Sequence, residues 1–572
     1  MFLKKSTRKD TGRTHLSIVQ GFWDNNSRQS RTKTIKTLGY LDDLQKLYDD
    51  PIAHFEKVVA EMNQKQLESD APATLSIDLK EQIKPDSAGR KNFGYAALSK
   101  IYHELGLHTF LVNRQRNLSI DYSLNNIMKL MVFSRLLNPA SKKKTYEERG
   151  RYFEHTDFSL DDIYRSLSLI NKHKDAIQFW LHQKICERYG RNTDLVYYDV
   201  TNYYFEIDEP DELRKKGVSK EHRPDPIVQM GLFMDTRGLP ISYRLFPGNQ
   251  PDKTTLVPML AELTREYNLG RVIVVADKGL NTARNIYYNT HGLGNGYVLS
   301  QTVRGAHKEL KDFVLDEEGY VWQGQDYKIK SRLYPREITI TGSNGKPKKV
   351  RIDEKQVVFY SRDYDKRAKA EREPAVMKAL DLVRDPAKYN KATSYGAAKY
   401  VRNLVFDKDT GEILASKQTP IFDTAKLREE EKFDGYYAIV TSEWKKSDEE
   451  IIEIYRGLWR IEESFKVTKS DLEARPVYLS RKDHIEAHFL ICFVALVIAR
   501  LLQQRIGDKY SVTRILESLN KVSCAHIKEN YYLFDYTDEV TDAIGNALGI
   551  DFSKKFMRLK DIKNILGDVK KG

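Results

Sequence analysis

The chain has only three cysteines and no apolar run long enough to cross a membrane. Cys186, Cys492 and Cys524 are far apart, which argues against a disulfide framework and indicates buried free thiols in a reducing compartment. The longest apolar run, residues 489–499, is well short of the roughly 20 residues that a membrane span needs. The first residues are basic and lack the apolar run of a signal peptide. We therefore expect a cytoplasmic protein with no membrane segment.

Basic residues outnumber acidic ones, 94 to 81, and the excess is concentrated near the N-terminus. Residues 1–36 contain nine basic side chains against only Asp10 and Asp24. Such an arm predicts a polyanionic partner, most commonly nucleic acid, although a solvated basic hairpin gives the same pattern. The cluster Lys142, Lys143 and Lys144 allows the same two interpretations, a DNA contact or a solvated loop.

Beyond residue 194 the pattern changes from helical to strand-rich. Short β-branched and aromatic stretches predict three strands, then a helix, then a fully apolar strand, at residues 195–205, 228–234, 241–246, 254–267 and 272–276. Three antiparallel strands followed by a helix and a strand parallel to the first would open a ribonuclease H-like mixed sheet. The fold class predicted is therefore α/β.

Two aspartates stand at informative places in these strands. Asp199 interrupts an aromatic strand, where an unpaired carboxylate is costly unless a metal or an arginine neutralises it. Asp277 ends the apolar strand, at the edge of an α/β sheet where ligands collect, although a helix-capping aspartate would look the same. Either aspartate alone has a structural explanation.

A third group lies near the C-terminal end of the chain. Tyr455, Glu462 and Lys469 recur at every seventh residue. On one regular helix this step returns to within about 20° of the same face, so a hydroxyl, a carboxylate and an ammonium would share a stripe able to hold a metal and a phosphate. Glu462 would thus complete a set of three carboxylates.

Three carboxylates on two neighbouring strands and a packed helix can hold two divalent ions about 4 Å apart. Hard oxygen ligands favour Mg²⁺, with Mn²⁺ as the alternative, over Zn²⁺. One ion would activate a water or a 3′-hydroxyl and the other would stabilise the leaving oxygen, which is the chemistry of phosphodiester hydrolysis and transesterification.

Five blocks of sequence together resemble the DDE transposases of bacterial insertion sequences. The blocks are residues 199–206, 219–226, 247–256, 276–279 and 459–478. They are similar in particular to the insertion-sequence-four-like group, in which a β insertion precedes the glutamate helix. The resemblance implies a ribonuclease H-like core, binding of double-stranded transposon ends and target DNA, a homodimer in the synaptic complex, and a place in the bacterial cytoplasm.

Carried over by position, the resemblance makes Asp199, Asp277 and Glu462 the catalytic, metal-binding triad. Tyr455 and Lys469 would hold the phosphate beside the cleaved bond. The family pattern expects an arginine where this chain has Leu458, so the DNA contact would fall to Arg456 or Arg460.

The domain organisation predicted from these patterns has six segments. They are a basic β arm with a linker (1–90), a helical DNA-binding region (91–190), the first part of the catalytic core (191–300), a mainly β insertion (301–435), the second part of the core (436–508) and a helical C-terminal tail (509–572).

Other interpretations remain open at this level. A haloacid dehalogenase-type phosphatase would use Asp199 as nucleophile, but it needs an aspartate where Thr201 stands. A catalytically impaired or domesticated DNA-binding relative is the other alternative, because of Leu458. His484 and His488 have a spacing that can bind zinc but are interpreted as packing residues. Trp459 is expected in the core, with stacking on a displaced base as the alternative.

Overall fold

The structure of the protein, a computed structural model, divides into two compact units, residues 1–85 and 86–572. The residues that it describes are 1–7, 12–24, 29–68, 80, 82, 89–220, 224–342, 345–391, 393–406, 412–414 and 419–571.

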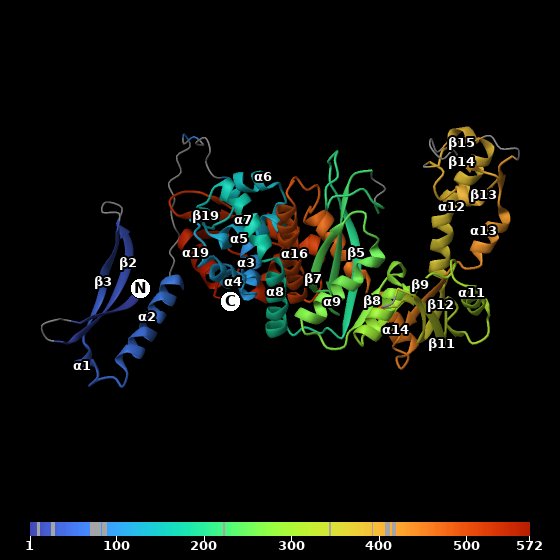
Figure 1. Ribbon diagram of the computed structural model, residues 1–572. Helices are drawn as coiled ribbons and strands as arrows, with labels where there is room; N and C mark the ends of the chain where they lie inside the picture. Colours follow the sequence, from blue (N-terminus) through green and yellow to red (C-terminus); the bar gives the residue numbers. More distant parts are fainter. Residues whose placement is uncertain are drawn as a thin grey trace. The chain divides into compact units, whose positions relative to one another are not determined.

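The N-terminal unit is a three-stranded antiparallel sheet with helices after it (Figure 1). Its elements are β1 (Phe2–Thr7), β2 (Thr14–Asp24), β3 (Gln29–Tyr40), α1 (Leu41–Leu44) and α2 (Pro51–Glu68). Leu16, Leu44 and Phe55 form its small core. The basic arm near the N-terminus therefore contains β strands, as predicted, and residues 25–28 between β2 and β3 lie outside the described residues.

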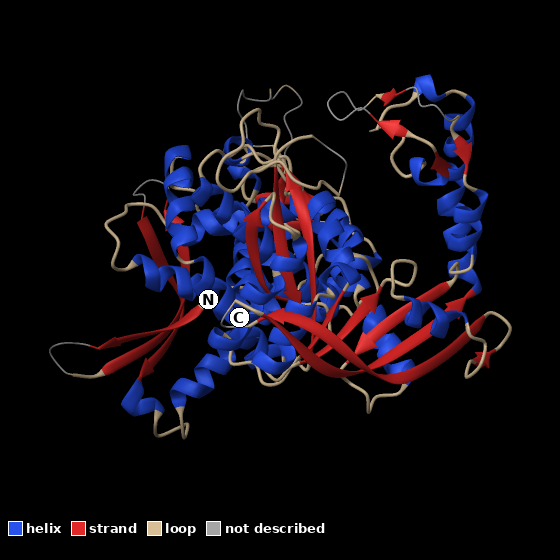
Figure 2. Ribbon diagram, turned by 45° about the vertical axis from the view of Figure 1, so that its right-hand side comes forward, coloured by secondary structure: helices blue, strands red, loops and turns tan. Residues whose placement is uncertain are grey.

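A nine-stranded sheet dominates the larger unit (Figure 2). Its order is β10-β11-β12-β17-β9-β8-β5-β6-β7. The strands are β5 (Leu195–Tyr204), β6 (Ile227–Met234), β7 (Pro240–Pro247), β8 (Ile273–Ala276), β9 (Gly296–Gln301), β10 (Val321–Gln323), β11 (Tyr327–Thr341), β12 (Pro347–Ser361) and β17 (Tyr436–Thr441). β5 is antiparallel to β6 and parallel to β8, as the sequence predicted for a ribonuclease H-like sheet.

Alternation along β5 separates two cores. The even-numbered Val196 and Tyr198 pack with the apolar residues of α9 (Leu256–Glu266). The odd-numbered Tyr197 and Tyr203 belong to the core that contains the helix α16 (Lys482–Arg505). Because side chains alternate between the two faces of a strand, Asp199 faces the α16 side of the sheet.

The helix α16 is long and apolar enough to cross a membrane by length and composition, although its longest unbroken apolar run, residues 489–499, is short. In the structure 94% of its most apolar stretch of 18 residues is buried inside the protein. It packs against three helices of the region preceding the sheet, α3, α5 and α7. Its apolar surface is therefore explained by its place in the core.

The region expected to be helical is confirmed as such. It contains α3 (Tyr95–Glu104), α4 (Leu107–Gln115), α5 (Leu124–Leu137), α6 (Lys142–Glu147), α7 (Leu160–Lys172) and α8 (Lys174–Tyr189). Within it the thiol of Cys186 is exposed, contrary to expectation, whereas Cys492 and Cys524 are buried; all three are free.

The C-terminal segment corrects the predicted helical tail. It contains α17 (Val512–Lys521), β18 (Ser523–His526), β19 (Tyr531–Phe534), α18 (Glu539–Leu548), β20 (Phe556–Arg558) and α19 (Leu559–Asp568). Its strands form one sheet with β4 (Lys91–Asn92), which opens the helical region. The tail is therefore a mixed α/β part of that region.

The insertion, predicted to be mainly β, also contains the helices α11 (Lys308–Leu315), α12 (Arg362–Arg384) and α13 (Thr424–Glu431), and part of it belongs to the central sheet. Its long strands β11 and β12 extend the central sheet, since β12 pairs with β17. The chain then leaves the sheet through the long helix α12 and short elements up to α13. The chain returns to the sheet next to the point at which it left, since the amide of Ser361 donates a hydrogen bond of 3.0 Å to the carbonyl of Gly435.

Candidate active site

The two aspartates lie side by side on the central sheet. The parallel pairing of β5 with β8 places Tyr197 opposite Val275. Two residues further along lie Asp199 on β5 and Asp277 directly after β8, and the charge of Asp277 contributes to raising the pKa of Asp199. The carboxyl end of β8 is the edge of an α/β sheet at which a site is expected.

Three hydroxyl groups organise the surroundings of Asp277. Its Oδ1 accepts hydrogen bonds from Ser300, at 2.7 Å, and from Tyr455, at 3.2 Å. The hydroxyl of Tyr437 lies 3.1 Å from that of Tyr455. Ser300 and Tyr437 belong to β9 and β17, so the carboxylate is held from neighbouring strands and from one helix.

The stripe of Tyr455, Glu462 and Lys469 is not carried by one regular helix, and this corrects the sequence prediction. Tyr455 lies on α14 (Asp448–Arg456), Glu462 on α15 (Trp459–Lys466) and Lys469 in a π-helical turn (Val467–Asp471). The break at Gly457 occurs against β5, because a Cβ at that position would lie 2.0 Å from the hydroxyl oxygen of Tyr197. The π turn is tied to the same strand, since the hydroxyls of Thr468 and Tyr203 are 2.7 Å apart.

The three residues nevertheless reach the same site. Burial is the largest influence on the pKa of Asp199 and raises it to about 6, with Asp277 and Glu462 adding smaller repulsive contributions and Lys220 opposing the rise. Burial and Lys220 lower the pKa of Lys469 to about 8, against the attraction of Asp199. The triad predicted from sequence is therefore brought together electrostatically.

Lys220 is the cation that the sequence prediction missed. Its ammonium group hydrogen-bonds the carbonyl oxygen of Val200, the residue after Asp199. It lies in the block 219–226, one of the blocks that carry the family resemblance, but its residue type alone indicated no role.

A cleft of about 640 Å³ opens beside Glu462 and Tyr455. Its lining combines aromatic and basic side chains from the insertion and from the helices, including Arg304, Tyr364, Arg367, Arg456 and Trp459. Trp459 is 53% exposed, so the expectation of a core tryptophan is wrong. Leu458 is buried, so the position where the family pattern has arginine here contributes to packing.

The candidate DNA-contacting residues fall into two groups. Arg456 is exposed and lines the cleft, and the guanidinium of Arg460 lies 5.2 Å from the ring centroid of Trp459. Lys143 and Lys144 are exposed on α6, where Lys144 pairs with Glu148 at 3.0 Å. Lys142 is buried, so the structure does not present it at the surface as the lysine cluster predicted.

The acidic residue beside Glu462 has a different environment. Glu463 accepts a hydrogen bond of 2.9 Å from the guanidinium of Arg500, on α16. It therefore joins α15 to the buried helix instead of facing the aspartates.

The donor set suits a divalent cation. Asp199 and Asp277 are half-buried and Glu462 is exposed, and neighbouring carboxylates that repel one another are stabilised when a metal neutralises them. Within the described part of the chain, no three Asp, Glu, His or Cys side chains already stand close enough together to hold an ion. His484 and His488 are hydrogen-bonded to neighbouring groups, to Ser168 and Ala474, in keeping with a packing role.

Comparison with known families decides the assignment. A Transposase DDE domain matches residues 211–498, about half of the chain, and an IS1634 family transposase N-terminal domain matches residues 3–73. The chain belongs to the DDE transposase family. Of the three carboxylates of this transposase, Asp277 and Glu462 lie within the domain match and Asp199 precedes it. The finer resemblance to the insertion-sequence-four-like group stays a prediction.

Solved transposase structures are also similar to this transposase at low identity. The piggyBac transposase synaptic complex with hairpin DNA has 7% identity, covers 85% of this chain and 88% of its own, and gives a TM-score of 0.33. The Mos1 transposase paired-end complex with the left transposon end has 15% identity, covers 43% and 73%, and gives 0.14. No curated protein matches the transposase.

Proposed function

We propose that this transposase binds the terminal inverted repeats of its own insertion sequence, cleaves them to free 3′-hydroxyls, and joins these ends to target DNA. The observation that supports this most directly is that Asp277 and Glu462, both within the matched DDE domain, lie near enough to Asp199 for their charges to raise its pKa. Catalytic impairment is not favoured, since all three carboxylates are present.

Asp199, Asp277 and Glu462 are the proposed ligands of two Mg²⁺ ions, with Mn²⁺ as a substitute. Bound there, the ions would activate the attacking oxygen and stabilise the leaving oxygen of a phosphodiester. The protein's own groups prepare the site. Ser300 and Tyr455 orient Asp277, and Lys220 reduces the repulsion that Asp199 experiences before metal binds.

Lys469, Arg456 and Arg460 are the proposed DNA contacts at the site. The ammonium of Lys469 is close enough to Asp199 for their charges to interact, which suits contact with the phosphate beside the cleaved bond. Arg456 and Arg460 flank Trp459, whose exposed ring offers a surface on which a base could stack. Tyr455 is proposed to act through Asp277 more than through the DNA.

The remaining partners follow from the mode of action. Joining two ends requires a synaptic complex, for which a homodimer is proposed, and the working compartment proposed is the bacterial cytoplasm. The basic arm and helical region would supply affinity for double-stranded DNA, since cationic side chains on phosphates provide most sequence-independent binding.

A cleavage assay on duplexes that carry the element's own end sequences tests this function. In Mg²⁺, Asp277→Asn is expected to abolish nicking and strand transfer while end binding stays nearly unchanged, because the metal serves chemistry and not affinity. Asp194→Asn is the matched control, since Asp194 is exposed and lies just before β5. Substantial cleavage by Asp277→Asn would remove this carboxylate from the site.

A further inference from the structure

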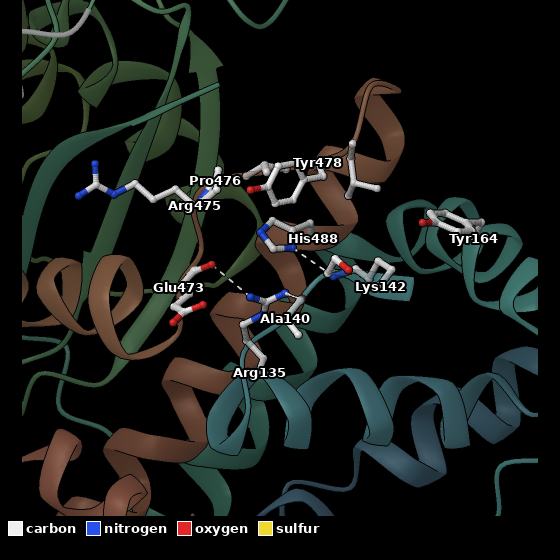
Figure 3. A pocket seen from close by; sticks show the side chains of 12 residues that line it. Arg135, Ala140, Lys142, Tyr164, Glu473, Arg475, Pro476, Tyr478 and His488 are labelled. Carbon is white, nitrogen blue, oxygen red and sulfur yellow. Dashed lines mark hydrogen bonds between the residues drawn. The ribbon is translucent and has the colours of Figure 1, made fainter. Parts of the chain in front are cut away.

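A second cluster of cations lies apart from the three carboxylates, in a cavity of about 190 Å³ (Figure 3). The cavity is lined by α5, α6, α7, α16 and the segment that follows the π turn. Lys142 and Arg135 line it, and each is only 6% exposed. Tyr478, 72% exposed, lies on its rim, so the cavity has an opening to solvent.

The hydrogen bonds in this cavity fix the donors. His488 donates from Nε2 to the carbonyl of Ala474 at 3.1 Å, which leaves Nδ1 of a neutral ring as an acceptor. Lys142 donates to that Nδ1 at 3.2 Å. Two further N–H groups of the ammonium stay available, because a lysine has three.

Arg135 has one donor without a partner. Its terminal nitrogens donate to the carbonyls of Leu472, Glu473 and Ala140, whereas its buried Nε has no hydrogen-bond partner. In Figure 3 its guanidinium lies below Lys142 and His488, next to Glu473. Backbone carbonyls satisfy its hydrogen bonds without neutralising its charge.

Among the described residues, no carboxylate forms an ion pair with Lys142 or Arg135, and Glu473 contributes only its carbonyl to the latter. Burial and the charge of Arg135 lower the pKa of Lys142 to about 7. Two buried cations without a counter-ion lower the stability of the folded state, and an anion bound between them would restore part of that stability.

We propose that this cavity binds a phosphate group, held by Lys142 and Arg135. The phosphate would come from a DNA backbone or from a free phosphate ion. The DNA source rests on the proposed function, because the lining segment continues from the turn that carries Lys469, and Arg475 of this segment stacks on Tyr204 at the end of β5. A DNA strand leaving the carboxylates along this segment would reach the cavity.

Thermal unfolding of the full chain with inorganic phosphate, against chloride at equal ionic strength, tests the site. Phosphate is expected to raise the melting temperature of the wild type, because a ligand that binds only the folded state stabilises it. Lys142→Met should lose most of that rise, and without phosphate it should melt at or above the wild-type temperature, since a buried unpaired charge is gone. Lys143→Met, one residue away and exposed, is the control and should keep the rise.

Duplex binding across a salt series separates the two sources. If the phosphate belongs to DNA, Lys142→Met should weaken specific and random duplexes by similar factors and lower the log–log salt slope by about 0.9. An unchanged slope together with the lost phosphate effect would assign a free phosphate ion. Equal phosphate responses of Lys142→Met and Lys143→Met would overturn the site, and neither result alters the cleavage test on Asp277.

Discussion

Asp199 occupies a position on β5 that is unfavourable for an ionised carboxylate. Partial burial raises the pKa of this carboxyl to about 6, so the fold favours the protonated form more than the unfolded chain does. A raised carboxyl pKa contributes stability below the unfolded-state value near 4, and this contribution is lost as the pH rises through 6.

Without metal, the wild type should become less stable between about pH 4 and pH 6, whereas Asp199→Asn should lack this component and melt at a higher temperature at pH 7. Thermal melts in the presence of a chelator measure both effects. Parallel pH profiles for the two proteins would show that Asp199 is not perturbed in the metal-free site.

Tyr455 allows a distinction between two roles. If its hydroxyl orients Asp277, Tyr455→Phe should slow cleavage by about tenfold, the equivalent of roughly 1.4 kcal/mol, with DNA affinity unchanged. If the hydroxyl instead contacts a DNA phosphate, the affinity of Tyr455→Phe for DNA should fall. Single-turnover cleavage and equilibrium binding on the same duplex separate these outcomes, and Tyr437→Phe reports on the partner hydroxyl.

At the scale of elements, two neighbouring glutamates on α15 are expected to serve different purposes, Glu462 in cleavage and Glu463 in stability. Glu462→Gln should eliminate nicking and strand transfer with little change in melting temperature. Glu463→Gln should lower the melting temperature, because the hydrogen bond to Arg500 loses its charge, while cleavage by the folded protein persists. The reverse pattern in cleavage assays on a pre-assembled end complex would show that the two glutamates are misassigned.

Of the three lysines on α6, only Lys143 and Lys144 are exposed, so only these two can be tested as surface contacts with DNA. Lys143→Ala combined with Lys144→Ala should flatten the salt dependence of duplex binding if both lysines contact phosphates, each by about 0.9 in the log–log slope. The substitution leaves the buried Lys142 intact. An unchanged slope would identify this face of α6 as solvated and without DNA contact.

Local patterns predicted the strands β5 to β8, because alternation and short apolar runs record burial directly, and the order of the elements suggested how these strands pair. The same patterns singled out Asp199, Asp277 and Glu462 as candidates, and the family resemblance made them the predicted triad. They did not reveal the break at Gly457, where the backbone closely approaches Tyr197, a residue distant in sequence. Nor did they reveal that β11 and β12 extend the central sheet, because the pairing of β12 with β17 depends on contacts between residues distant in sequence.

At the scale of the whole molecule, the two compact units predict separable behaviour. The unit 86–572 contains its own cores, so removing residues 1–85 should leave its unfolding transition in place. The same deletion removes the nine basic residues of the arm and should weaken binding to duplexes of any sequence. Calorimetry and binding assays on the shortened chain measure these effects. Loss of the transition would show that the units fold together.

The contact between Ser361 and Gly435 makes the two ends of residues 362–434 neighbours. The segment 362–434 leaves the sheet and returns to it at the same place, so its length can change without moving β12 or β17. The closure entropy of a loop grows only with the logarithm of its length, and variation there is thermodynamically cheap. Over evolutionary time this segment is where members of the family could gain or lose sequence, while the pairing of the strands that carry Asp199 and Asp277 is kept.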